Sequence, residues 1–467
     1  MKTQKEILII GAGLCGSLLA LRLGQLGYNV KVMEKRPDLR ESELKAGRSI
    51  NLALSNRGLK ALKLVGLENK VKSICIPMNG RMLHDKKGIT KMSKYSGRNK
   101  EYINSVSREL LTSLLITEAE SLENVSFEFD KNCNEIDFEK NIAYFIDNKT
   151  NKESKYTTDL IFGTDGAGST LRKNYFSKNK FLFNFSRNFL SHGYKELTIP
   201  PTDKGKHKIE KNALHIWPRG DYMIIALPNM DGSFTVTLFL SYDEGKYNFS
   251  NLSTAESVND FFSSEFPDAL KLMPNLIDEF FKNPTGPLGT IKCFPWQYKG
   301  KNMILGDAAH AIVPFYGQGM NASFEDIFEL DKTLNENNGN WAKTIRFFEK
   351  QRKLNTDAIA DLAIDNFHEM KNHVANHIFQ EKRSLEMKLE TKLPGEYFSK
   401  YSLVTFREDI GYFEAMNRGR AQDKYILKMI RSKSPKLKLS EKDLNEIIKK
   451  ECNLILKEQN YNSIQNY

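Results

Sequence analysis

Residues Glu6–Glu34 read EILIIGAGLCGSLLALRLGQLGYNVKVME, and this stretch decides the fold of the first part of the chain. The apolar run Glu6–Ile10 predicts a buried parallel strand, Ser17–Leu26 has helical spacing, and Asn29–Met33 predicts a second strand. A G-x-G-x-x-G pattern joins the first strand to the helix. In this βαβ context the pattern predicts a dinucleotide-binding site, whereas the glycines alone would be a weak signal.

Each glycine of the pattern has a separate task. Gly11 allows the tight turn after the strand, Gly13 lets the backbone approach a pyrophosphate, and Gly16 lets helix and strand pack closely. Amide groups at the helix N-terminus then face the phosphates. Glu34 ends the second strand, where an acid accepts hydrogen bonds from the adenosine ribose. The predicted site also includes Ala12, Lys35, Arg36 and Cys15, the last as a small packing residue.

Two later segments repeat the combination of a strand, an acid and glycines. Residues 159–165 (DLIFGTD) end in Asp165 and are followed by Gly166, and residues 302–305 (NMIL) lead into Asp307. Ligands of open α/β sheets bind at the carboxyl ends of the strands. A second such site far along the chain suits a long dinucleotide whose other half is bulky.

Composition is typical of a globular protein, with 40% hydrophobic and 27% charged residues in a 467-residue chain that is long enough for about three folding units. The net charge of +11 favours anionic partners such as nucleotides, carboxylates, nucleic acid or a membrane surface. Residues 418–467 hold 12 Lys and Arg against 6 Asp and Glu. We interpret this basic tail as a solvated helical face.

The cysteines and the apolar runs indicate the compartment. Five cysteines without a C-x-x-C pair predict neither a disulfide framework nor a zinc ribbon. Glycines interrupt the N-terminal apolar run, so it does not predict a signal peptide, and no run of 18 apolar residues predicts a membrane span. A soluble cytoplasmic protein is expected. His373 and His377 have helical spacing but lack an H-E-x-x-H pattern, so no metal site is predicted.

Residues 213–242 predict three strands of an antiparallel sheet. Their apolar runs are separated by turns rich in Gly, Asp and Asn. We expect this sheet to be inserted between the cofactor-binding segments, with one face on the core and one face lining a pocket or solvent.

The three strand–glycine segments together resemble the aromatic-ring hydroxylases, a family of FAD-dependent monooxygenases. The resemblance implies that the N-terminal glycine loop binds the ADP half of FAD and that Asp165 and Gly166 lie near its pyrophosphate. It further implies that Asp307 binds the ribityl chain and that Arg108 contacts FAD. The backbone implied to face the flavin ring belongs to Gly317, Gly319, Met320 and Asn321. No second G-x-G-x-x-G is present, so NADPH or NADH is expected to dock transiently as a co-substrate.

Five shorter segments resemble the branch of this family that hydroxylates L-kynurenine at ring carbon 3. They are GRMLH (80–84), HIWPRG (215–220), MIIALPN (223–229), DNFHEM (365–370) and YSLVTF (401–406). The resemblance implies that Arg81, Tyr95 and Tyr401 bind the substrate carboxylate, and that Asn366 adds an amide contact. The residues implied to line the aromatic side of the substrate are Pro314, Phe315, Tyr316, Gln318 and Met370.

The reaction implied by the resemblance is carried out by the cofactor. NADPH reduces FAD, reduced FAD and O₂ form a C4a-hydroperoxide, and ring carbon 3 of kynurenine attacks its distal oxygen to give 3-hydroxykynurenine. No side chain is therefore expected to act as a nucleophile or base, and no metal is required.

The resemblance extends from about residue 7 to about residue 425 and implies an α/β fold like that of para-hydroxybenzoate hydroxylase. The implied domains are a Rossmann-like FAD domain (1–75, 98–180 and 285–340), an inserted antiparallel substrate sheet (76–97 and 181–284) and a helical C-terminal domain (341–467). Helical spacing predicts helices over 345–393, 401–428 and 439–456, and a frayed end over 457–467.

Other interpretations stay open at this point. A related flavoenzyme would hydroxylate a phenol or halogenate its substrate, but a phenol hydroxylase favours a base near the hydroxyl group, and the Trp-rich signature of halogenases is absent. A second alternative is a non-enzymatic protein that binds nucleic acid through its basic tail, although the tail contains no recognised binding motif. The same tail is too polar to span a membrane, which implies a soluble, bacterial-type enzyme. A monomer and a homodimer are equally compatible with the sequence.

Overall fold

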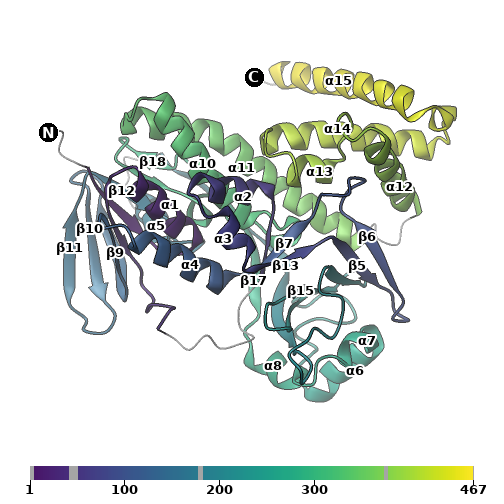
Figure 1. Ribbon diagram of the computed structural model, residues 1–467, viewed down its shortest axis with the longest axis horizontal. Helices are drawn as coiled ribbons and strands as arrows, with labels where there is room; N and C mark the ends of the chain where they lie inside the picture. Colours follow the sequence, from purple (N-terminus) through teal and green to yellow (C-terminus); the bar gives the residue numbers. More distant parts are fainter. Residues whose placement is uncertain (1–4, 42–50, 177–181, 373–376, 466–467) are drawn as a thin grey trace.

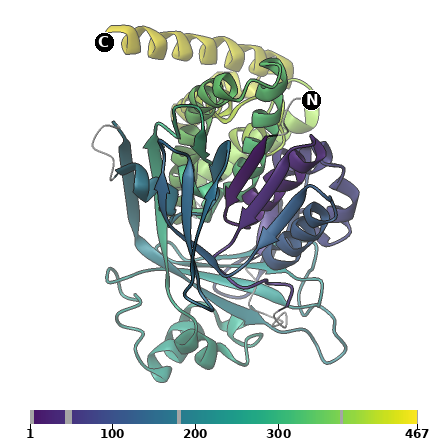
Figure 2. The same ribbon diagram turned by 90° about the vertical axis from the view of Figure 1, so that its left-hand side faces the viewer.

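The computed structural model describes residues 5–41, 51–176, 182–372 and 377–465 (Figure 1). Two large sheets lie side by side, and helices cover both of them. The C-terminal helices lie at one end of the molecule, over the second sheet (Figures 1 and 2). Within the described part of the chain, no helix combines the length and the apolar composition needed to cross a bilayer.

The first large sheet has six strands and is parallel except at one edge. In order across the sheet they are β18 (Gln297–Tyr298), β19 (Asn302–Ile304), β12 (Leu160–Gly163), β1 (Glu6–Ile10), β2 (Asn29–Met33) and β8 (Val125–Glu128). Central β1 pairs in parallel with β2 on one side and β12 on the other. The predicted strand–helix–strand unit is confirmed, because α1 (Leu14–Gln25) connects β1 to β2. All three glycine-bearing turns thus lie at the carboxyl edge of one sheet.

The second large sheet has seven strands. They are, in order, β17 (Gly286–Phe294), β13 (Asn184–Ile199), β16 (Phe234–Ser241), β15 (Met223–Pro228), β14 (Leu214–Pro218), β5 (Gly80–His84) and β6 (Thr90–Lys94). The predicted antiparallel meander is confirmed as β14, β15 and β16. β5 pairs in parallel with β14, so a segment from early in the chain extends the meander.

The two faces of the seven-stranded sheet have different neighbours. One face packs its apolar side chains on α6 (Ala255–Glu265), α7 (Pro267–Leu270) and α8 (Leu276–Lys282), which lie beneath the sheet in Figure 1. Phe239 and Met223 belong instead to a cluster with residues of the C-terminal helices. The sheet therefore separates a purely structural core from a layer that also contains the candidate site.

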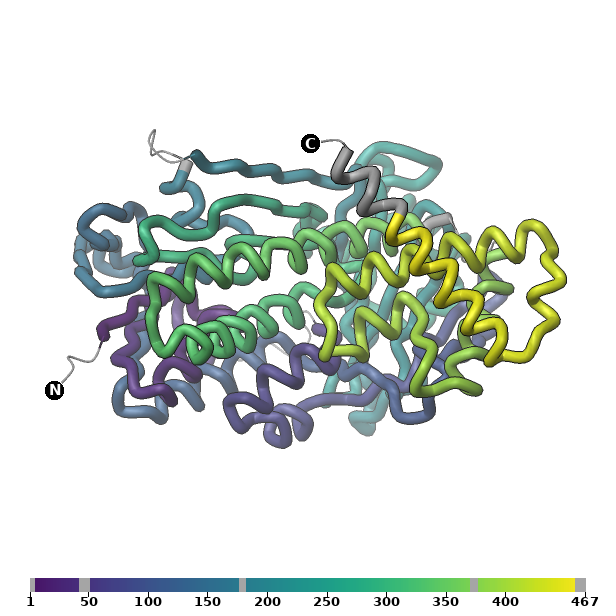
Figure 3. Tube along the Cα trace, turned by 90° about the horizontal axis from the view of Figure 1, so that it is seen from above, coloured from purple at the N-terminus to yellow at the C-terminus, as the bar shows by residue number. Residues whose placement is uncertain are grey.

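The helical part begins with two long helices, α10 (Gly319–Glu336) and α11 (Trp341–Asn372), which run side by side in Figure 3. The helices that follow are α12 (His377–Lys392), α13 (Lys400–Thr405), α14 (Tyr412–Arg431) and α15 (Glu441–Gln465). Two predictions were wrong here. The helix expected over 401–428 is broken, because α14 starts anew at Gly411, where a Cβ atom would lie 2.3 Å from Asn355 Oδ1. The end expected to fray from residue 457 continues α15, which packs on α14 and α12.

The remaining elements connect or cover the two large sheets. Two three-stranded sheets are formed by β3 (Asn51–Leu54), β7 (Ile103–Ser107) and β4 (Cys75–Met78), and by β11 (Glu153–Thr157), β10 (Ile142–Asp147) and β9 (Lys131–Asp137). The other helices are α2 (Asn56–Leu64), α3 (Glu68–Lys72), α4 (Arg108–Glu120), α5 (Thr170–Phe176), α9 (Asp307–His310), and the short 3-10 turns η1 (Pro314–Tyr316) and η2 (Pro435–Lys438). The division into three domains stays a proposal; β17, which falls in the proposed segment 285–340, pairs with β13.

Candidate active site

The N-terminal glycine loop has the backbone geometry that its spacing predicts. Gly11 has φ +105°, a left-handed conformation that favours glycine, and its amide donates to Met33 O at 2.8 Å. A Cβ atom at Gly16 would lie 2.0 Å from Gly11 O, so the helix can pack this closely on the glycine turn only because residue 16 has no side chain. At Gly13 no atom lies within 4 Å of such a Cβ. Gly16 therefore serves packing, and Gly13 leaves space beside the start of α1.

Glu34 connects the end of β2 to the glycine loop. Its Oε2 accepts from the amide of Ala12 at 2.9 Å, and its Oε1 accepts from the amide of Arg36 at 3.0 Å. The Glu34 side chain is buried, whereas Lys35 and Arg36 are exposed. Glu34, the residue predicted to bind the ribose, is thus fixed in place, while its neighbours Lys35 and Arg36 lie at the protein surface.

Asp165 lies at the end of β12, where it caps the start of α5. Its Oδ2 accepts from the amide of Thr170 at 2.6 Å, but its buried Oδ1 has no hydrogen-bond partner among the described residues. Burial raises the pKa of Asp165, although hydrogen bonds to its carboxylate oppose this shift. Gly166, with φ +76°, has open space where a Cβ would stand. This turn presents an unsatisfied acceptor next to an unobstructed backbone.

Asp307 begins α9 directly after β19. Its carboxylate is partly exposed and makes no hydrogen bond within the described chain. Asp326 holds the turn beneath it, because its Oδ2 accepts from the amide of Gly306 at 3.0 Å and pairs with His310 Nε2 at 2.6 Å. Cys15 packs under the same turn, and burial raises the pKa of its thiol, consistent with a packing role.

A buried ion-pair network that the sequence analysis missed supports this turn. Arg352 pairs with Glu325 and Asp326, in each case at 2.6 Å, and Arg57 pairs with Glu325 at 2.6 Å. Arg57 also donates to Val404 O at 2.7 Å, so the network reaches the end of α13. In the sequence, the two adjacent acids Glu325 and Asp326 do not stand out, because the same helix contains further acids such as Glu329 and Asp331.

The segment before α10 is fixed by side chains that the sequence analysis assigned to the site. Gly317 has φ +68°, and Asn321 donates to Gly317 O at 2.9 Å and Ala53 O at 2.8 Å. Gln318 is buried and accepts from the hydroxyl of Tyr412 at 2.9 Å. These amides hold the segment in shape, and the partly buried Gly319 and Met320 follow at the start of α10.

Three predicted substrate residues form an aromatic column. The ring of Tyr401 stacks on Tyr95 at 5.6 Å and on Tyr316 at 5.7 Å between centroids. The guanidinium of Arg81 lies over two of these rings, 4.5 Å from the Tyr401 centroid and 5.4 Å from that of Tyr95. These residues come from β5, the end of β6, η1 and α13, so the fold gathers them from distant parts of the chain.

One hydroxyl group of this column, that of Tyr95, lacks a hydrogen-bond partner in the described part of the chain. Tyr95 is 1% exposed, and its hydroxyl makes no hydrogen bond to the described residues. Burial raises the pKa of both Tyr95 and Tyr316, so these phenols stay protonated donors. Burial alone would lower the pKa of Arg81, but the oxygens of Tyr401, Tyr95 and Tyr316 outweigh it and the pKa is raised. The charged guanidinium of Arg81 thus lies close to the Tyr95 hydroxyl, a donor that has no acceptor among the described residues.

Asn366 on α11 holds the turn η1 against the column. Its Nδ2 donates to Phe315 O at 2.6 Å, and the Phe315 ring packs on Phe367 at 4.6 Å and Phe239 at 4.9 Å. Pro314, at the start of η1, is exposed. The Met370 side chain lies outside the described residues, as does His373.

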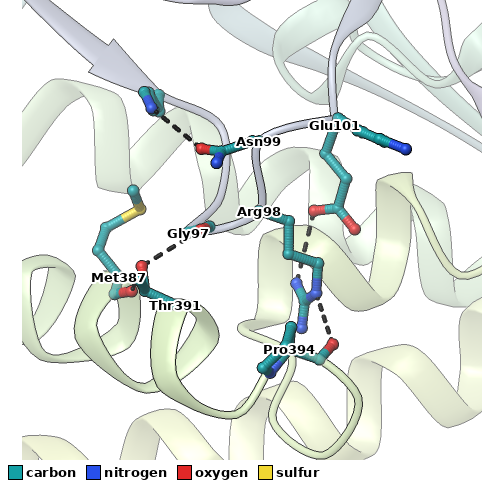
Figure 4. Close-up of a pocket in the computed structure, with 9 residues that line it drawn as sticks. Gly97, Arg98, Asn99, Glu101, Met387, Thr391 and Pro394 are labelled. Atoms are coloured by element: carbon teal, nitrogen blue, oxygen red, sulfur yellow. Dashed lines mark hydrogen bonds and ion pairs between the residues drawn. The ribbon is translucent and has the colours of Figure 1, made fainter.

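The loop after Tyr95 is attached to the C-terminal helices. Arg383 donates to Tyr95 O at 2.7 Å, Gly97 N donates to Glu390 at 3.0 Å, and Arg98 donates to Pro394 O at 2.8 Å. Figure 4 shows the hollow, of about 630 Å³, between this loop and α12. No residue of the aromatic column lines this hollow, so it is separate from the candidate site.

Arg108 is the residue predicted to contact FAD from outside the glycine turns. It begins α4 behind the capping hydroxyl of Ser107, and its side chain is exposed. Its charge acts on Glu196 and Tyr194 of β13, whose pKa values are raised mainly by burial. A contact of Arg108 with a cofactor stays a prediction.

The three turns at the sheet edge fit FAD. Open space at Gly13 and Gly166 admits a phosphate-bearing group to the backbone. Asp165 Oδ1, which has no partner among the described residues, is an acceptor suited to a hydroxyl group. The Asp307 carboxylate offers acceptors for hydroxyl groups. The Gly317–Asn321 segment connects this edge to the aromatic column, so the flavin ring of bound FAD would lie near this segment.

Comparisons with known proteins agree with this fit. The sequence matches the FAD binding domain family over residues 4–180 and 292–355. It is 44% identical over 440 residues to kynurenine 3-monooxygenase of Dictyostelium discoideum, covering 92% of this chain and 94% of that protein. It is 43% identical to kynurenine 3-monooxygenase of Myxococcus xanthus strain DK1622, covering 86% of each chain.

Among solved structures, the fold is similar to tetrameric 2-methyl-3-hydroxypyridine-5-carboxylic acid oxygenase. The TM-score is 0.63 at 21% identity, covering 85% of this chain and 99% of that one. This likeness confirms the predicted FAD-monooxygenase fold with its mixed sheets and helical C-terminal region. Together with the extensive sequence identity, it shows that the chain belongs to the kynurenine 3-monooxygenase family of FAD-dependent aromatic monooxygenases.

Proposed function

We propose that this protein hydroxylates L-kynurenine at ring carbon 3, with FAD as its cofactor and NADPH and O₂ as co-substrates. Bound FAD supplies the redox chemistry, since it accepts hydride from NADPH and activates O₂. The protein contributes substrate binding, orientation of the ring and exclusion of water.

One observation carries the choice of substrate class. Arg81 is a charged guanidinium with no carboxylate partner among the described residues, and the buried Tyr95 hydroxyl beside it has no acceptor. A partly buried cation and a buried donor without an acceptor are costly unless an anion joins them. The carboxylate of an amino-acid substrate meets this need, because it accepts hydrogen bonds from Arg81, Tyr95 and Tyr401 together.

The wall of the site orients the aromatic end of the substrate. Asn366 fixes η1 through Phe315 O, and so holds Phe315 and the column residue Tyr316 in place just before the start of α10. Both rings are buried, so they exclude water from the region where oxygen transfer takes place. A simple phenol would leave the Arg81 cluster without its anion, and this favours kynurenine over the phenol alternative.

The basic tail supports no separate nucleic-acid-binding role. α15 packs on α14 and α12, and its Lys449 pairs with Glu446 at 3.0 Å and Glu396 at 3.4 Å. Part of the positive charge of the tail is therefore neutralised by acidic side chains of the C-terminal helices and the loop between them.

The direct test measures NADPH oxidation by the purified flavoprotein. L-Kynurenine should accelerate oxidation, whereas the analogue that lacks the α-carboxylate should act only at much higher concentration. A protein that oxidises NADPH no faster with kynurenine than without it would overturn the proposed substrate.

A further inference from the structure

A buried cluster of two histidines, a tryptophan and an aspartate lies behind the strand that carries Arg81. His84 and Arg81 are three residues apart on β5, so their side chains project from opposite faces of the sheet. His84 and His215 are 5% and 1% exposed, and the His84 ring stacks on Trp217 with centroids 4.0 Å apart. None of these residues belongs to the proposed substrate site.

The hydrogen bonds of the cluster leave few ways to distribute its protons. His215 Nε2 lies 2.7 Å from Glu210 O, which can only accept, so this nitrogen carries a proton. In neutral His215 the Nδ1 atom is then an acceptor, and His84 Nε2, at 2.8 Å, must donate to it. His84 Nδ1 faces Asp268 Oδ2 at 3.0 Å, and the same oxygen accepts from Trp217 Nε1 at 2.7 Å. An ionised Asp268 can only accept, so the second nitrogen of His84 must donate as well.

The charge states of the two neighbours agree with this distribution. Burial lowers the pKa of His215 to about 4, so His215 is neutral at pH 7. Burial alone would raise the pKa of Asp268, but hydrogen bonds from His84 and Trp217 outweigh it, and the pKa is lowered. Asp268 is therefore ionised at pH 7.

Other charged groups near the cluster are occupied with one another or with carbonyl groups. Arg219 donates to His84 O at 2.9 Å, Asp85 O at 3.1 Å and Glu265 O at 2.6 Å. Lys86 pairs with the Glu265 carboxylate at 2.5 Å. The only carboxylate in contact with the His84 ring, within the described chain, is that of Asp268.

We propose that His84 is a doubly protonated imidazolium in the resting enzyme, and that its ion pair with Asp268 fixes β5 on α7 so that Arg81 is held at the substrate carboxylate. His84 is thus a positioning residue that acts through Arg81, and this role rests on the proposed function. The ladder between β5 and β14, with Arg81 opposite Leu214 and Met82 opposite His215, transmits the position of His84 along the strand.

The protonation state is tested on the wild-type holoenzyme by NMR with ¹⁵N-labelled histidine. The chain has eight histidines, and the signal of His84 is assigned by its loss in His84→Gln. We expect both ring nitrogens of His84 to be protonated at pH 7.5, with His215 a neutral Nε2–H tautomer. A His84 with one unprotonated nitrogen would overturn the proposal. This measurement needs no turnover, so its failure is distinct from a failure of kynurenine to act as substrate.

The positioning role is tested by separating KM from kcat. His84→Gln and Asp268→Asn should each raise KM for L-kynurenine roughly tenfold, the equivalent of one weakened charge-assisted contact, with kcat and FAD content near wild type. His207→Gln is the matched control, since His207 makes a single carbonyl bond, to Asn229 O at 2.8 Å, and should leave both constants unchanged. An unchanged KM in both cluster variants, or an equal loss of KM, kcat and flavin content, would contradict the role. If both variants fail to fold, the wild-type NMR result decides.

Discussion

The guanidinium of Arg81 on β5 lies 4.5 Å from the ring centre of Tyr401 on α13, although the two residues belong to opposite ends of the sequence. The same guanidinium lies 5.4 Å from the Tyr95 ring. The C-terminal helices therefore complete a candidate site whose cation is provided by the seven-stranded sheet. Binding of a carboxylate would satisfy the groups that the fold leaves unpaired.

Replacing Arg81 should affect binding more than chemistry. Arg81→Ala removes a charge-assisted contact worth about 1.5–3 kcal/mol, so kcat/KM for L-kynurenine should fall about 10- to 100-fold, mainly through KM. Lys91→Ala, on exposed β6, is the control for loss of a positive charge. Steady-state kinetics with kynurenine and with its decarboxylated analogue check this. A similar loss on the analogue would show that Arg81 does not act on the carboxylate.

Two glycines of the N-terminal loop should respond differently to alanine. Gly13→Ala adds a methyl group in open space, so the protein should fold but lose FAD affinity. Gly16→Ala places a methyl group 2.0 Å from Gly11 O and should prevent normal folding. Circular dichroism and the flavin absorbance of the purified variants distinguish the two effects. A Gly13→Ala protein with full flavin content would contradict the assignment of this face to the cofactor.

The network under the Asp307 turn should matter for stability. Arg352→Met leaves Glu325 and Asp326 buried without this partner, and breaking a buried pair costs about 3–5 kcal/mol. Arg418→Met is the matched control, because its exposed pair with Glu414 should be worth less than about 1 kcal/mol. Urea denaturation midpoints measure both effects. Equal midpoints for the two variants would show that the network is not structural.

The same network predicts how stability depends on pH. Burial alone would raise the pKa values of Glu325 and Asp326, but Arg352, Arg57 and His310 lower them below their usual range. Their stabilisation is therefore complete above about pH 5, where carboxylates are also ionised in the unfolded chain, and is lost as pH falls through the lowered values. The Tm of the wild type should drop on acidification below about pH 5, and the Tm of Arg352→Met should drop less. Parallel Tm curves would contradict this.

Local patterns predicted the parallel strand–helix–strand unit at the start of the chain. The strand–glycine–helix unit depends on backbone conformations that only certain glycine spacings allow. The strand–helix–strand structure of Glu6–Met33 could therefore be predicted from the sequence. Patterns of helical spacing did not show that α13 ends at Thr405 and that α14 begins after Gly411, where Asn355 of a distant helix leaves no room for a side chain. The Arg57–Glu325 pair was hidden for a similar reason, because its members are 268 residues apart and meet only in the folded protein. The predicted substrate residues come from family resemblance, and the clustering of three of them around Tyr401 could not have been derived from spacing.

The most direct measurement of the central claim uses ¹⁸O₂. The purified protein, with FAD, NADPH and L-kynurenine, is allowed to turn over under labelled oxygen, and the product is analysed by mass spectrometry and by comparison with authentic 3-hydroxykynurenine. The account predicts 3-hydroxykynurenine with one ¹⁸O atom on the ring. Absence of that product, or a product whose new oxygen comes from water, would contradict it.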